Sequence, residues 1–127
     1  MRTPFQNLLA FNNEVEQHWT ALGECLEKDG LLTADLKEQV RRVLAQGNGC
    51  EYCKAKGNPD PSQYDEKAAI CTAFAEAFLH SKGQTSPNVT AILKEYLTAE
   101  EIGELLAFIS FTTASQYFGA LNQLQPN

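Results

Sequence analysis

The sequence has no hydrophobic run that approaches the ~20 residues needed to cross a bilayer. Its N-terminal segment leads into only a short apolar patch before Asn12, which does not fit a secretory signal. Basic residues are scarce, since 10 Lys and Arg stand against 16 Asp and Glu for a net charge of −6. Nucleic acids and anionic membranes bind clustered positive charge. We therefore expect a cytoplasmic protein that binds neither nucleic acid nor membrane.

Cysteine is also sparse, with four residues in a chain of 127. That number is too small for a disulfide-dense secreted fold. Hydrophobic residues make up 43% and charged residues 20%, which is typical of a globular protein and not of a disordered one. The length suits one domain. We expect a single domain over residues 1–127.

Strand-like alternation is missing, and apolar residues recur at helical spacing almost throughout the chain. The fold class predicted by this spacing is all-α, a helical bundle of about six helices. The first lies within residues 1–30, with one apolar stripe from Leu8 to Leu26. The others cover residues 33–47, a short segment from Cys50, and residues 62–79, 89–97 and 98–124. Thr33 is the expected cap of the second helix, and Thr98 with Glu101 forms a capping box for the last.

The last predicted helix has two apolar faces. One contains Ile102, Leu105 and Ile109, and the other contains Phe108, Phe111 and Phe118. A helix that is apolar on two sides needs two surfaces to pack against. The second face is therefore either a subunit interface or the result of a central position within the monomer.

The most informative motif is the C-x-x-C sequence Cys50-Glu51-Tyr52-Cys53. It follows a glycine-rich stop at 47–49 and begins a short helix, whose free amides and dipole would stabilise a thiolate. Residues three apart share a helix face, so the two sulfurs can meet in a disulfide. An attacking thiol with a nearby resolving thiol is what disulfide exchange requires. Tyr52 is expected to be a packing residue.

Two other interpretations of the cysteines remain open. Zinc needs two further ligands, but Cys71 and His80 are nine residues apart and fall on opposite helix faces. Cys25 and His18 are seven apart and could share a face, yet no second C-x-x-C or H-x₃₋₅-H supports a site. Alternatively, the pair is unreactive. We favour redox chemistry, with no metal and no organic cofactor.

A resemblance supports this preference. Glu38 is followed by eleven residues and then Cys50, and Asn48-Gly49-Cys50-Glu51-Tyr52-Cys53 is similar to the signature of the carboxymuconolactone decarboxylase and alkylhydroperoxidase D-like superfamily. The segment 97–124 is similar to the family's closing helix, so the family-like core covers about residues 33–124. The family's histidine would fall four residues after Cys53, and that position is Gly57.

The resemblance implies an alkylhydroperoxidase D-like fold, a homo-oligomer that is commonly trimeric or hexameric, and a thiol-dependent oxidoreductase. Cys50 and Cys53 would reduce a small hydroperoxide or a protein disulfide and be restored by a thiol-reductant protein. Helix electrostatics favour Cys50 as the attacking thiol, whereas the resemblance favours Cys53. The alternative is a catalytically inactive family member that serves as an oligomeric structural or binding protein.

The resemblance also makes Glu38 a candidate proton carrier. From the helical pattern alone, Glu38 lies across the helix from Leu36 and Val40 and would be a solvated surface residue. The family Glu instead faces a pocket. Partial burial would raise the pKa of the carboxyl and suit it to proton transfer. The predicted catalytic residues are therefore Cys50, Cys53 and Glu38.

Overall fold

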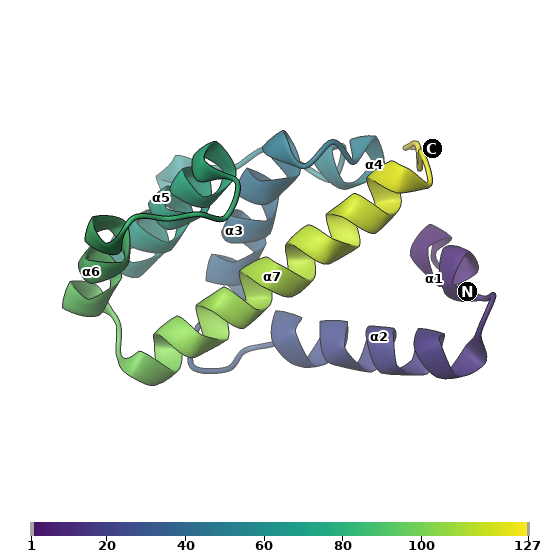
Figure 1. Cartoon of the computed structure of the whole chain (residues 1–127), viewed down its shortest axis with the longest axis horizontal. Helices are drawn as coiled ribbons and strands as arrows, with labels where there is room; N and C mark the ends of the chain where they lie inside the picture. Colours follow the sequence, from purple (N-terminus) through teal and green to yellow (C-terminus); the bar gives the residue numbers. More distant parts are fainter. Residues whose placement is uncertain (1, 127) are drawn as a thin grey trace.

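The computed structural model describes residues 2–126, and within them the chain is helical and contains no strand. Across residues 2–126, seven α-helices and one 3-10 turn follow one another (Figure 1). They are α1 (Pro4–Leu9), α2 (Asn13–Glu27), α3 (Ala34–Gly47), α4 (Glu51–Lys54), η1 (Pro61–Gln63), α5 (Glu66–Ser81), α6 (Pro87–Tyr96) and α7 (Ala99–Leu121). The all-α class is confirmed.

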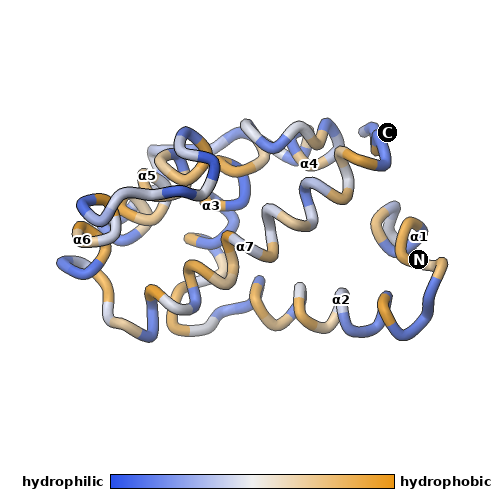
Figure 2. The backbone as a smooth tube through the Cα atoms, in the orientation of Figure 1, coloured by the Kyte–Doolittle hydropathy of each residue, from blue (hydrophilic) through white to orange (hydrophobic). Residues whose placement is uncertain are grey.

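The long helix α7 crosses the molecule (Figure 1), with α3, α5 and α6 on one side and α1 and α2 on the other. The main core lies where α3 packs against α5 and α7, and it includes Val40, Leu44, Cys71, Leu105 and Ile109. Figure 2 shows hydrophobic residues recurring along α7, as expected for a helix with neighbours on both sides. The short α4 contacts α3 and α7 near the C-terminal end of α7.

Most helix boundaries follow the predicted capping residues. The Thr33 hydroxyl accepts a hydrogen bond from the Leu36 amide, and α3 ends at Gly47 as expected. Thr98 and Glu101 form the predicted capping box at the start of α7. Their two reciprocal bonds satisfy backbone amides that an uncapped helix start would leave unpaired.

The predicted N-terminal helix is wrong in one respect, because it is two helices. The side chain of Asn12 accepts a hydrogen bond from the Val15 amide and starts α2 anew. The apolar stripe changes accordingly, since Phe11, Val15 and Leu22 are exposed. The side of α2 that packs inward contains Trp19, Gly23 and Leu26.

The second apolar face of α7 is covered by the chain itself. Phe108 is buried in the main core. The ring of Trp19 in α2 lies 5.5 Å from that of Phe111 and 5.4 Å from that of Phe118. The packing of Trp19 on this face favours the central position within the monomer, and the subunit interface stays a prediction. The homo-oligomer stays a prediction.

A buried ion pair holds the connection between α2 and α3 against α7. The Lys37 ammonium, whose side chain is 2% exposed, lies 3.3 Å from the Glu104 carboxylate and donates a hydrogen bond to the Lys28 carbonyl. The same carboxylate accepts hydrogen bonds from the Leu31 and Leu32 amides at 3.3 and 2.8 Å. The buried Lys37 ammonium and both oxygens of Glu104 thereby gain partners.

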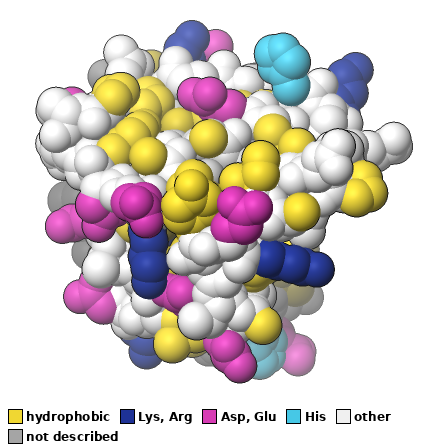
Figure 3. All heavy atoms as spheres, turned by 90° about the vertical axis from the view of Figure 1, so that its left-hand side faces the viewer, with side chains coloured by type: hydrophobic (Ala, Val, Ile, Leu, Met, Phe, Trp, Pro, Cys, Tyr) yellow, Lys and Arg dark blue, Asp and Glu magenta, His cyan; other side chains and the backbone are white. Residues whose placement is uncertain are grey.

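The surface carries mixed charge. On the face drawn in Figure 3, Lys and Arg side chains lie apart from one another among Asp and Glu side chains. Within residues 2–126, no helix combines the length and the apolar character that a membrane span requires.

Candidate functional site

Cys50 and Cys53 form a disulfide, with their Cα atoms 5.2 Å apart. Gly49, in the left-handed region at φ +79°, turns the chain out of α3 and directs Cys50 into the cap position of α4. The sulfur of Cys50 accepts a hydrogen bond from the Cys53 amide at 3.2 Å. The expectation that one helical turn brings the two sulfurs together is confirmed, although α4 is only this single turn.

Both cysteines are buried, Cys50 more deeply than Cys53. Cys50 is 1% exposed and Cys53 is 7% exposed. Both belong to a small second core with Ala45, against which Phe5 and Tyr52 pack. Cys50 lies against Gly119 of α7, where an added Cβ atom would come within 2.7 Å of its sulfur. Cys50 thus faces the interior of the molecule.

Cys53 faces a pocket of about 310 Å³ between α1, α2, α4 and α7. Four aromatic residues line it: Phe5, Trp19, Tyr52 and Phe111. The same pocket includes the charged residues Glu24, Glu27, Arg41 and Lys56. Cys50 and Glu38 are not among its lining residues. Cys53 is therefore the cysteine of the pair that borders the pocket, although it is itself buried.

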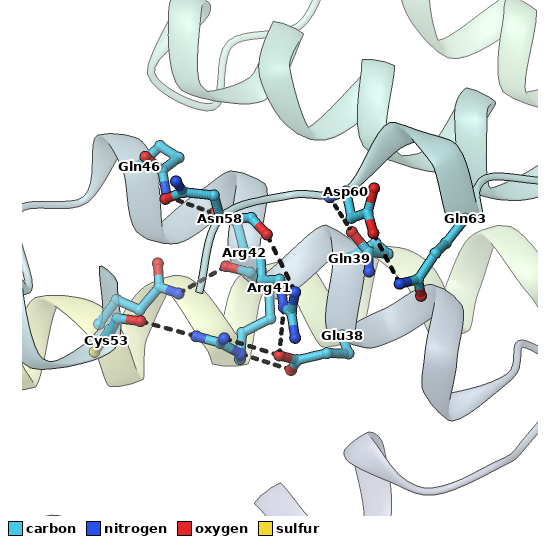
Figure 4. A network of polar contacts seen from close by, with 10 residues as sticks. Glu38, Gln39, Arg41, Arg42, Gln46, Cys53, Asn58, Asp60 and Gln63 are labelled. Carbon is cyan, nitrogen blue, oxygen red and sulfur yellow. Dashed lines mark hydrogen bonds and ion pairs between the residues drawn. The ribbon is translucent and has the colours of Figure 1, made fainter. Parts of the chain in front are cut away.

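Glu38 is 40% exposed at its side chain and is held by two arginines. Arg41 donates hydrogen bonds of 2.7 and 2.9 Å to its two oxygens, and Arg42 donates one of 2.9 Å (Figure 4). Partial burial raises the pKa of Glu38, but the hydrogen bonds and charges of the arginines outweigh it and lower the pKa below its usual 4.5. The expectation of a raised pKa for Glu38 is wrong. The helical spacing of the sequence does not show that the side chains of both arginines bind this carboxylate.

The same arginines connect Glu38 to the cysteine segment. Arg41 also donates to the Cys53 carbonyl at 3.1 Å, and Arg42 donates to the Asn58 carbonyl at 3.1 Å (Figure 4). The buried Gln39 accepts a hydrogen bond from the Asp60 amide at 2.8 Å. The polar side of α3 thus binds the backbone of α4 and of the segment that follows it.

Gln116 of α7 supports this arrangement from the other side. Its buried side chain accepts a hydrogen bond from Asn48 at 2.8 Å and donates one to the Arg41 carbonyl at 3.2 Å. It also lines the pocket beside Cys53. Gln116 is not among the residues predicted for the site, although a glutamine in the middle of an apolar helix was an available signal.

Gly57, where the resemblance predicts a histidine in family members, has a φ of +135°. A Cβ atom there would lie 3.3 Å from the guanidinium carbon of Arg42. Both His18 and His80 are exposed, and neither lines the pocket. The side-chain positions therefore leave the cysteines without a histidine partner among residues 2–126.

Glu27 was also missed, and it lines the Cys53 pocket together with Lys56, whose position within a turn of Cys53 predicts positive charge beside the cysteines. Burial raises the pKa of Glu27, an effect that the charges of Lys56 and Arg41 only partly offset. Burial and the charge of Arg41 lower the pKa of Lys56, whose ammonium lies 4.8 Å from the centre of the Tyr52 ring. Tyr52 is thus a packing residue, as predicted. Glu27, Arg41 and Lys56 also border a second hollow of about 410 Å³ that Glu38 lines.

The other two cysteines are free thiols in contrasting places. Cys25 is exposed on α2, and Cys71 is buried in the main core. Burial, with smaller contributions from nearby carboxylates, raises the pKa of Cys71 to about 12. Cys71 is therefore an unreactive small hydrophobe, as its position on an apolar helix face predicts.

The fold and site describe an all-helical protein with a C-x-x-C disulfide that borders an aromatic pocket on one side. Across residues 2–126, no three His, Cys, Asp or Glu side chains gather in a way that could hold a metal ion. Comparisons with protein-family models, with curated proteins and with solved structures found no match.

Proposed function

We propose that this protein is a thiol-dependent oxidoreductase in which Cys50 and Cys53 alternate between dithiol and disulfide. The observation that carries the proposal is the Cys50–Cys53 disulfide, whose Cys53 lines a pocket that Cys50 does not line. A pair of sulfurs one turn apart can exchange electrons with a reactant only where one of them is accessible. The reactant is a small hydroperoxide or the disulfide of a partner protein, and a thiol-reductant protein restores the dithiol.

In this proposal Cys53 attacks the reactant and Cys50 resolves the intermediate. Accessibility favours Cys53, which borders the pocket, over Cys50, which is almost fully buried against Gly119. The dipole argument for Cys50 weakens because α4 is only four residues long. Burial suits a resolving thiol, which has to react only with its own neighbour.

Glu38 has a positioning role in the same proposal. Its carboxylate accepts three hydrogen bonds from Arg41 and Arg42, and Arg41 in turn donates to the Cys53 carbonyl. Such charge-assisted bonds are strong and directional. Glu38 would therefore fix the positive charge of Arg41 beside the Cys53 segment.

We further propose that the chain is an alkylhydroperoxidase D-like protein that works in the cytoplasm as a homo-oligomer. The support is the Glu38–Cys50 spacing, the Cys50–Cys53 motif and the capped closing helix. The cytoplasm keeps thiols reduced, so a disulfide in a cytoplasmic protein is usually transient and catalytic. Exposed apolar side chains such as Phe11 and Leu121, at 72% and 83% exposure, are candidates for subunit contacts.

Thiol counting tests the proposed chemistry. A Cys25→Ser variant removes the exposed bystander thiol, and Cys71 is too deeply buried to react. We treat the reduced protein with one equivalent of an organic hydroperoxide, alkylate it and analyse it by mass spectrometry. We expect the free thiols of Cys50 and Cys53 to disappear together. We also expect the pH dependence of alkylation to give one thiol a pKa well below the ~8.5 of a free cysteine. Cys53→Ser should abolish hydroperoxide consumption.

The opposite result would favour an inactive structural or binding protein. In that case both thiols would titrate normally and would not pair under mild oxidant. Hydroperoxide consumption with a dithiol reductant would then match that of the Cys50→Ser/Cys53→Ser double variant.

A further inference from the structure

Glu27 is a carboxylate of the Cys53 pocket that, among residues 2–126, no other side chain binds. It lies at the last position of α2 and borders the same pocket as Cys53. Within residues 2–126, neither a hydrogen bond nor an ion pair engages its carboxylate. Glu38, by contrast, has both oxygens bound by arginines. Glu27 is therefore free to gain and lose a proton.

Four charged side chains, from α2, from α3 and from the segment after α4, influence the pKa of Glu27. Lys56, just after α4, and Arg41 of α3 favour its ionised form, whereas Glu38 of α3 and Glu24 of α2 disfavour it. Burial is the largest influence and raises the pKa of Glu27. The polar pocket residues from α1 and α7 are uncharged: Gln6, Thr112, Ser115 and Gln116. The balance leaves Glu27 easier to protonate than an ordinary surface glutamate.

We propose that Glu27 is the proton-transfer residue for Cys53. This inference rests on the proposed oxidoreductase function. It fills a role that Glu38, bound by two arginines, and the exposed His18 and His80 are not placed to fill. The transfer takes place directly or through one water molecule, as is usual for a general acid or base.

The chemistry balances with a hydroperoxide, ROOH, as the reactant. The S–H bond of Cys53 breaks, its proton passes to the Glu27 carboxylate, and the sulfur keeps the electron pair. The thiolate attacks the terminal oxygen, the O–O bond breaks, and the leaving RO⁻ takes the proton from Glu27 to give ROH. The sulfur of Cys50 then displaces hydroxide from the Cys53 sulfenic acid, and the Cys50 proton leaves with it as water. Two thiols are oxidised and one hydroperoxide is reduced.

Two reactions of the same thiol separate proton transfer from simple access. Iodoacetamide releases iodide, which needs no proton, whereas a hydroperoxide releases an alkoxide, which does. We would measure both rates against pH in the Cys25→Ser protein and in its Glu27→Gln and Glu27→Asp versions. Glu14→Gln is the matched control, because Glu14 lies on α2 and outside the pocket.

We expect Glu27→Gln to slow hydroperoxide reduction by about 100-fold more than it slows alkylation of Cys53, because both reactions need the thiolate and only the first needs a proton for its leaving group. The Glu27-dependent limb of the pH–rate profile should vanish, Glu27→Asp should restore part of the rate, and Glu14→Gln should match the parent. Equal slowing of both reactions would show a structural role and overturn the proposal, as would an unchanged hydroperoxide rate. A parent protein that forms no disulfide with a hydroperoxide overturns the oxidoreductase function itself, and this inference with it.

Discussion

At the scale of single residues, the two sulfurs of the disulfide have different neighbours. Cys53 borders the pocket, whereas Cys50 lies in a space that only a glycine at position 119 leaves open. An added Cβ at Gly119 would lie 2.7 Å from the Cys50 sulfur and 3.2 Å from the Phe5 ring. A sulfur in a disulfide cannot rotate away from such a clash, so the cost falls on the packing between α4 and α7.

Gly119→Ala should therefore destabilise the oxidised protein. Overpacking of this kind costs about 1–3 kcal/mol, which urea unfolding would detect as a lower free energy of unfolding. Gly103→Ala is the matched control on the same helix, because its Cβ would meet nothing within 4 Å. That change should stabilise the protein by about 0.5–1 kcal/mol through helix propensity. Equal stabilisation by both substitutions would contradict the close seating of Cys50 against α7.

The cysteine pair could be predicted from the sequence because its geometry is local. Three residues of separation and a glycine stop determine how Cys50 and Cys53 meet. The pocket could not be predicted in the same way, since the packing of α2 and α7 brings Glu27 and Gln116 to the same pocket as Cys53. The pKa direction of Glu38 failed for a related reason, because helical spacing does not say which rotamers Arg41 and Arg42 adopt.

At the scale of helices, sequence patterns predicted the elements that begin and end at strong capping residues. Thr33 and Thr98 cap α3 and α7 as expected, and Gly49 separates α3 from α4. The break after α1 was missed because Leu8 and Phe11 continue a helical spacing across it. The cap at Asn12 and the exposed Phe11 show that local hydrogen bonding prevailed over the apolar pattern there.

The connection between α2 and α3 depends on one carboxylate of α7. Burial raises the pKa of Glu104, but bonds from the Leu32 and Leu31 amides and from Lys37 outweigh it and lower the pKa. Glu104→Gln removes the charge opposite the buried Lys37 ammonium, which should cost about 2–3 kcal/mol of unfolding free energy at neutral pH. Urea titration would measure the loss.

The pH dependence of that loss has a defined sign. A carboxylate with a lowered pKa stabilises the fold fully above its ordinary pKa of 4.5, and the stabilisation disappears as pH falls through the lowered value. The difference between the parent and Glu104→Gln should therefore shrink on acidification below about pH 4.5. Glu100→Gln, an exposed change on the same helix, should cost only ~0.5 kcal/mol. A difference that grew toward acid pH would contradict the assignment.

At the scale of the whole molecule, a redox cycle requires a fold that survives both states of the disulfide. The main core of α3, α5 and α7 does not include Cys50 or Cys53, which belong to a separate small cluster. The disulfide also closes a loop between residues only three apart. A short loop loses little chain entropy when it is closed, so the cross-link restricts the unfolded chain only slightly.

Reduction should therefore lower the free energy of unfolding by no more than about 2 kcal/mol, the chain-entropy value for so short a loop. Urea unfolding with and without a phosphine reductant would measure it, and the helical circular-dichroism signal should be unchanged before the transition. The Cys50→Ser/Cys53→Ser variant, measured under both conditions, separates the cross-link from other effects of the reductant. The main core holds the helices together without the sulfurs, so we expect the reduced protein to unfold cooperatively. Loss of cooperative unfolding on reduction would mean that the fold depends on the disulfide. A disulfide that the fold depends on cannot be opened in every catalytic cycle, so that result would also argue against the proposed oxidoreductase.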